Sequence, residues 1–195
     1  KLTPVGEVSY GSYGTINGAA HVSGNTHGLR YLAGMNFLTS DGLSAALDTN
    51  ETNPLIDPAF QDSVRTPFDK DAFSRFNALL KAGYDISERI SVDVSAQMDQ
   101  YDADIDNAEF TDDENRQYSS RQYLFSILPK YSYTNGSLEG RFAYNTVTRT
   151  DFNDSSEYVQ LPAFSYLNGF TDSRYTGKFI HAAVENKYRL SPSTW

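Results

Sequence analysis

The sequence predicts an all-β fold, specifically an antiparallel transmembrane β-barrel, from three observations on its 195 residues. Apolar and polar residues alternate with a period of two in successive stretches, and helical spacing fits none of them over a comparable length. Short and long connections alternate strictly between these stretches. The two sides of the predicted strands differ in chemistry, because one side is apolar and the other is charged.

The first three strands are predicted at residues 5–12, 15–24 and 28–40. The first strand leads into the turn-forming sequence Gly11-Ser12-Tyr13-Gly14, and the second carries small residues at several of its apolar positions. The third strand alternates more clearly. Its apolar positions are Leu29, Tyr31, Ala33, Met35 and Phe37.

The other five strands are predicted at residues 72–85, 89–104, 120–134, 137–151 and 174–189. Alternation is clearest from Ile90 to Met98, where every second residue is apolar and Asp93 is among the polar residues between them. No helix would bury that pattern on one face. Apolar positions of the remaining strands include Phe76, Leu80, Phe125, Ile127, Phe142, Tyr144, Ile180 and Val184.

The connections between these strands are of two kinds. Residues 24–28, residues 87–89 and the pair Asn135-Gly136 form short links, and Asn-Gly is the preferred pair for a type I′ hairpin turn. Residues 41–71, 105–119 and 152–173 form long polar links rich in Asp, Asn and Pro. Outer-membrane barrels have short periplasmic turns and long extracellular loops, so the alternation favours that architecture over a soluble sandwich.

The side opposite to the apolar positions is strongly charged, which fits a wetted barrel interior better than a small soluble core. Aromatic residues such as Tyr31, Tyr84 and Tyr188 lie near strand ends, where interfacial girdles are found. The alternative is a soluble antiparallel sheet whose charged face is simply solvated. The charged side holds Arg30, Arg75, Lys81, Asp93, Asp99, Lys130, Glu139, Arg141, Arg149, Glu185 and Lys187.

Seven bases against four acids on that side would be costly inside a narrow closed barrel of eight strands, where charges must pair. The imbalance favours an arc of a wider barrel, of about 22 strands, whose lumen holds a plug. Lys1 and Trp195 look like internal positions, so we expect the chain to be a piece of a larger protein that contains this partial barrel domain over residues 1–195.

Composition narrows the function classes. A net charge of −9, from 16 Lys and Arg against 25 Asp and Glu, argues against a nucleic-acid partner held by phosphate contacts. The absence of Cys excludes disulfides, thiolate metal sites and cysteine nucleophiles. The mean hydropathy is −0.52, and no stretch of the sequence is apolar over the length that a transmembrane helix needs.

Three short strings carry a resemblance to a known family. The sequences at residues 11–15, 29–34 and 40–45 resemble the first barrel strands of TonB-dependent outer-membrane receptors, and are most similar to the vitamin B12 (cobalamin) receptor branch. The sequence Tyr101-Asp102-Ala103, ahead of an acidic loop, also resembles that branch. The similarity in pattern spans essentially the whole chain, whereas the plug and the terminal aromatic strand of the family are not part of this sequence.

The resemblance implies energised import of a scarce nutrient, such as cobalamin or a ferric siderophore, across the bacterial outer membrane. A small-molecule ligand would bind to the extracellular loops and plug, and the TonB–ExbB–ExbD complex would act through the missing plug. Outer-membrane lipid and a surface lipoprotein are the other partners that we expect. No cofactor is required, and no bond is made or broken.

Acidic residues in the long loops provide candidate calcium ligands, because Ca²⁺ prefers six to eight hard oxygen donors. In the cobalamin receptors, calcium between the second and third extracellular loops orders these loops for the ligand, and only Asp102 carries over from the family motif. The candidates are Asp102, Asp104 and Asp106 at alternate positions, with Asp48 and Asp57 in the earlier loop. The alternative is that these carboxylates are solvated and bind no ion.

Aromatic residues at strand tops and in the polar loops are candidate ligand contacts, because an exposed ring in a polar loop needs a partner. The alternative is that the rings pack the loops against one another. The candidates are Tyr101, Phe60, Phe110, Tyr158, Phe164 and Tyr166.

Catalytic patterns are absent from the sequence. The three His residues have no metal-ligand spacing, and no nucleophile elbow or phosphate-binding glycine loop occurs, so we expect no enzymatic activity. Three alternatives to the receptor remain open at this point: a passive outer-membrane porin, a small closed barrel, and a soluble β-sandwich that binds carbohydrate.

Overall fold

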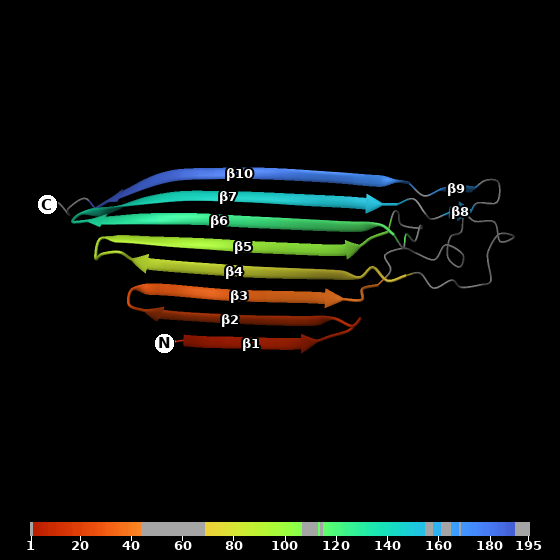
Figure 1. The fold of residues 1–195 in the computed structure, drawn as a ribbon, viewed down its shortest axis with the longest axis horizontal. Helices are drawn as coiled ribbons and strands as arrows, with labels where there is room; N and C mark the ends of the chain where they lie inside the picture. Colours follow the sequence, from red (N-terminus) through yellow and green to blue (C-terminus); the bar gives the residue numbers. More distant parts are fainter. Residues whose placement is uncertain are drawn as a thin grey trace, which may run out of the picture.

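The computed structural model describes residues 2–43, 69–106, 113, 115–154, 158–160, 165–167 and 169–189. These residues form an all-β fold, which confirms the predicted class (Figure 1). Eight strands make one antiparallel sheet, and two short strands, β8 and β9, pair with each other. Among the described residues, no helix is long and apolar enough to cross a membrane.

The sheet follows the chain order β1-β2-β3-β4-β5-β6-β7-β10 and is open, with β1 and β10 as its two edges. The eight strands therefore do not close on themselves into a small barrel. Their bounds are Leu2–Tyr10 (β1), Ile16–Thr26 (β2), Leu29–Ser40 (β3), Phe73–Asp85 (β4), Ile90–Asp104 (β5), Gln117–Tyr133 (β6), Gly136–Asn153 (β7) and Thr171–Tyr188 (β10), with β8 at Tyr158–Gln160 and β9 at Ser165–Leu167.

The long strands extend further than the alternation indicates. β6 begins three residues before the expected position 120, and Gln117 pairs with Phe152 of β7. β10 begins at Thr171, where residues up to 173 were expected to form a loop. In these added strand residues both faces are mostly polar. The ladder of backbone hydrogen bonds therefore continues beyond the last residues at which apolar and polar side chains alternate.

All the long connections leave from one end of the sheet, together with the short β1–β2 turn at residues 11–15, and the other short turns lie at the opposite end (Figure 1). We name these the loop end, where β3, β5 and β7 finish, and the turn end, where residues 27–28, 86–89 and 134–135 reverse the chain. Neighbouring turns are also joined by backbone hydrogen bonds. The carbonyls of Gly28, Arg89 and Asn135 accept from the amides of Asp85, Ser132 and Arg189 at 3.1, 2.7 and 2.7 Å.

The Asn-Gly turn prediction is wrong in its position and type. The turn residues are Thr134 and Asn135, while Gly136 already pairs with Tyr133 in the ladder. None of these residues has positive φ, whereas His27 and Gly28 of the first tight turn have φ of 45° and 79°, as a type I′ turn requires. Gly136 is instead needed for close approach, because a Cβ there would lie 2.0 Å from the carbonyl oxygen of Lys187.

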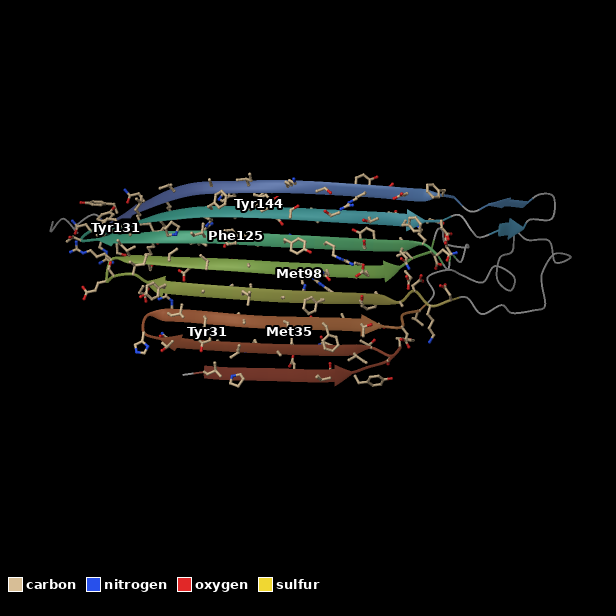
Figure 2. The ribbon with its side chains drawn as sticks, viewed as in Figure 1. Tyr31, Met35, Met98, Phe125, Tyr131 and Tyr144 are labelled. Atoms are coloured by element: carbon tan, nitrogen blue, oxygen red, sulfur yellow. The ribbon has the colours of Figure 1, made fainter. Side chains whose placement is uncertain are left out.

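Register assigns every strand residue to one of two faces, because directly opposed residues of antiparallel strands point the same way. The apolar face is the one that carries Leu80, Phe125 and Ile180, and the polar face is the one that carries Lys81 and Lys130. The face assignment predicted from alternation agrees with this register. Figure 2 labels six residues of the apolar face, spread from β3 to β7: Tyr31, Met35, Met98, Phe125, Tyr131 and Tyr144.

No hydrophobic core covers the apolar face. Leu80, Phe125 and Ile180 are 59%, 45% and 65% exposed, and Ala103 is the one buried hydrophobic residue of the described part. β8 and β9 contact no other strand, so within the described residues no second sheet packs on the first. Nearly all exposed large hydrophobic side chains of the sheet lie on the apolar face. The exceptions are Val5, Tyr175 and Phe179.

The apolar side chains of this face form a band that crosses the sheet obliquely. At the loop end, Phe37 is the last apolar residue of the band on β3. The residue of β10 that lies in line with Phe37, when paired residues are followed from strand to strand, is Thr176. On β10 the band instead ends at Ile180, four residues away. The opposite margin moves by the same four residues, from Val184, which is in register with the start of β3, to Tyr188. The band is therefore inclined to the strands.

We predict that Gly136→Ala destabilises the protein. The new methyl group would meet the Lys187 carbonyl, and overpacking of this kind costs about 1–3 kcal/mol. Gly6→Ala is the matched control, because a Cβ there has its nearest atom, the Ala19 oxygen, at 3.7 Å. Urea unfolding measures the stability of both variants. Equal midpoints for the two would contradict the close approach of β10 to the turn.

Candidate functional site

The polar face at the turn end carries ion pairs that link strands. Glu139 of β7 accepts from Lys130 of β6 at 3.1 Å and from Lys187 of β10 at 2.9 Å. Arg30 of β3 pairs with Asp85 and, at 3.3 Å, with Asp93. These side chains are all more than a quarter exposed, and each such pair contributes little to stability. Their effect is to hold the charged groups in an ordered layer.

Gly83 makes one of these links possible. A Cβ at this position would lie 2.1 Å from a carboxylate oxygen of Asp93 and 2.9 Å from a guanidinium nitrogen of Arg30. Because there is no side chain on Gly83, Arg30 of β3 reaches across β4 to Asp93 of β5. The arginine therefore spans three strands.

The expected excess of bases on the polar face is not present. Register adds the acids Glu7, Asp85 and Asp151 to the four named from the sequence, so seven acids (4 + 3) face seven bases. The short alternation windows missed these acids because they lie on the weak first strand or at strand ends. Charge imbalance thus gives no argument for a wide barrel. Three of these bases, Lys81, Arg141 and Arg149, form no ion pair within the described ranges.

A row of aromatic and basic side chains crosses the polar face near the loop end. Tyr101 of β5 lies in register with Arg75 of β4 and, through Ser120, with Arg149 of β7. Its ring centroid is 6.2 Å from that of Tyr118, at an interplanar angle of 59°. Arg75 pairs with Asp99 at 2.8 Å. The row offers two ring faces beside an arginine, which is the chemistry that binds planar or anionic groups.

The connection between β5 and β6 is tied to the end of β7 by buried polar groups. Asp113 and Asn153 are only 2% and 1% exposed, and the Asn153 amide donates to the Asp113 carboxylate. Arg116 makes a bidentate contact with Asp151 at 3.2 and 3.0 Å. Hydrogen bonding to that carboxylate raises the pKa of the Arg116 guanidinium, which therefore stays charged throughout the accessible pH range.

Three carboxylates converge next to this buried group. One oxygen each of Asp69, Asp71 and Asp106 lies within 4.8 Å of the others, and all three residues are half-buried. The Asp106 carboxylate also accepts from the backbone amide of Asp113 at 3.2 Å. The cluster joins the segment before β4 to the segment after β5. Carboxylate oxygens are the kind of ligand that Ca²⁺ prefers, and these three would supply part of the six to eight oxygens that it takes.

The predicted calcium ligands are not brought together as a set. Asp102 and Asp104 lie on the apolar face of β5, beyond the band, and Asp102 pairs with Arg121 at 2.7 Å. Asp106 lies past the end of β5, where its neighbours are Asp69 and Asp71. Asp48 and Asp57 lie outside the described residues.

Of the predicted aromatic contacts, Tyr101 is the one whose side chain the structure describes. Tyr158 and Tyr166 fall in the paired strands β8 and β9, where only the backbone is described. Phe60, Phe110 and Phe164 lie outside the described residues.

Sequence reasoning missed Asp69, Asp71 and Asn153, because no local pattern reports which connections and strand ends lie close together in space. Asp113 and Tyr118 do carry a sequence signal, since Asp113 stands in an acidic run of residues 105–119 and Tyr118 is an aromatic residue in the same polar stretch.

Comparison with known proteins adds no family to this description. No protein-family model matches the chain, and no curated protein sequence does so either. The class that the fold defines is an all-β protein with one open, two-faced antiparallel sheet.

Proposed function

We propose that this sheet is part of the wall of a transmembrane β-barrel in the bacterial outer membrane. Its apolar face would contact lipid, and its polar face would line the barrel interior. The observation that carries the proposal is the oblique band of uncovered hydrophobic side chains on one face. An exposed apolar surface of this size is unfavourable in water, so it needs an apolar environment.

The dimensions of the band support a bilayer rather than a second protein layer. A displacement of four residues over the five steps from β3 to β10, at about 3.4 Å per residue and 4.8 Å per strand, gives a tilt of about 30°. Strands of membrane barrels tilt by about 35–45°. On β5 the band covers nine residues, Ile90 to Met98, which at this tilt span about 25 Å, the height of the lipid-facing band of such barrels.

The open sheet and the placement of the connections support an arc of a larger barrel with its long loops outside the cell. β1 and β10 do not pair, and each leaves one edge without a partner in the described part of the chain. Sheet edges are not stable in hydrocarbon, so further strands must complete the wall. All the long connections lie at one end, as extracellular loops do.

Within that architecture we propose energised import by a TonB-dependent receptor. The strings at residues 11–15, 29–34 and 40–45 support this, because they resemble the first barrel strands of the cobalamin branch. The row that contains Tyr101 and Arg149 would meet a ligand that passes below the loops, and Tyr118 would add a second ring face. A plug would rest against the ion-paired layer of the polar face.

Calcium is proposed at the base of the loops, held by Asp69, Asp71 and Asp106. Three carboxylate groups lie within reach of one ion here, and carboxylate oxygens are the ligands that Ca²⁺ prefers. Bound there, the ion would join the segments before β4 and after β5, and so fix the loops that receive the ligand. Asp102 does not fit this role, since Arg121 already neutralises it.

The lipid-facing assignment predicts opposite environments for neighbouring residues. Because these 195 residues contain no Cys, a single introduced cysteine is the one labelling site in this sheet, and the variants are studied in vesicles. A label on Val94→Cys should be quenched by brominated lipids, and one on Ser95→Cys by aqueous iodide. Phe125→Cys and Ser126→Cys repeat the comparison on β6. Equal quenching within each pair would exclude the membrane wall.

Energised import predicts dependence on TonB. Cells that express the full-length protein should accumulate radiolabelled cobalamin, and uptake should fall to background in cells without TonB, because binding alone does not move the ligand. Uptake that continues without TonB would favour the passive porin instead. A soluble carbohydrate-binding module would give no uptake in either strain.

The calcium proposal predicts that Asp106→Asn weakens Ca²⁺ binding by about tenfold, because affinity depends on the number of charged ligands. Calorimetric titration of the full-length protein in detergent measures it. Asp102→Asn is the matched control and should bind calcium as the unmodified protein does, since its carboxylate pairs with Arg121. No calcium binding by the unmodified protein would refute the site.

A further inference from the structure

The apolar face becomes polar and basic where the band ends on β10. Lys178 and Arg174 lie two and six residues beyond Ile180 on the same face, and both are exposed. Within the described residues neither forms an ion pair. Two uncompensated cations on one strand are notable in a chain with a net charge of −9.

Hydroxyl groups fill the space between these cations. Register places Thr146 beside Lys178, Thr148 beside Thr176, and Thr150 beside Arg174. The Thr148 and Thr176 hydroxyls are 3.3 Å apart. The short threonines therefore form a polar floor, and the long side chains of Lys178 and Arg174 rise from one side of it.

The other charges on this part of the face do not neutralise the pair. Arg121 of β6 is held by Asp102 at 2.7 Å and by the Tyr101 carbonyl at 3.1 Å, so its guanidinium is turned toward β5. Asp172 follows on the same face beyond Arg174 and forms no ion pair with it in the described part. Among the residues that the structure describes, the uncompensated positive charge on this part of the face thus belongs to β10.

We propose that Arg174, Lys178 and the threonine floor bind the phosphate group of a phosphorylated lipid in the leaflet at the loop end. This inference rests on the proposed membrane wall, because the band then places Lys178 at the level of the lipid headgroups. Ammonium and guanidinium groups at that level attract anionic headgroups, and neutral hydroxyls donate further hydrogen bonds to phosphate oxygens. An anionic lipid is favoured over a neutral one by charge complementarity.

The test measures lipid retention by the full-length protein. The protein is reconstituted in phosphatidylcholine vesicles with and without lipid A, re-extracted in detergent, and the bound lipid is quantified by mass spectrometry. In Arg174→Gln/Lys178→Gln, lipid A occupancy should fall, by about fivefold for each cation removed. Lys81→Gln/Arg141→Gln removes the same charge from the polar face and should retain lipid A fully.

Three outcomes would overturn the site: full retention by the β10 variant, equal loss in the control, or equal retention of lipid A from which the phosphates have been removed. Displacement of lipid A by inorganic phosphate alone would indicate a free-anion site, and would also overturn it. Quenching of a label on Val94→Cys by brominated lipid, measured in the same variants, separates the proposal of a membrane wall from the proposal of a lipid site. If that label is quenched and lipid A is not retained, the membrane wall stands and the lipid site fails.

Discussion

The structure depends on one constraint. Its backbone hydrogen bonds are made within a single layer of strands, but its apolar side chains are not buried by that layer. Interstrand hydrogen bonds pair eight strands in one continuous ladder, yet nothing in the described residues covers Leu80, Phe125 or Ile180. In an ordinary domain a second layer would supply that cover. Here the ladder determines the shape, and the surroundings must supply the free energy that a core would otherwise provide.

The apolar and polar faces of the sheet place different demands on their side chains. On the apolar face the side chains need only be apolar, and residues as different in size as Ala, Leu, Met and Phe occupy it. On the other face charges must lie side by side without repulsion, and specific contacts such as that of Arg30 over Gly83 with Asp93 arrange them. Exposed pairs of this kind add little stability, so their value is in ordering a wet surface.

Sequence patterns predicted the parts of this fold that repeat locally. The alternation from Ile90 to Met98 correctly indicated a strand and the face of each residue. It missed the loop-end residues of β6, β7 and β10, because these mostly polar segments carry no apolar alternation although their backbones still pair. The convergence of Asp69 with Asp106 needed the fold itself, since residues from two connections meet only after β4 and β5 have paired.

The turn end has a consequence for how such a chain can evolve. Each of the three tight turns accepts a backbone hydrogen bond from the end of a later strand, through the carbonyls of Gly28, Arg89 and Asn135. A single inserted residue within a strand would exchange the two faces from that point onward, and an added residue in a turn would break its bond to the neighbour. The fold should therefore tolerate insertions and deletions best at the loop end, where a new surface can form without disturbing the sheet that supports it.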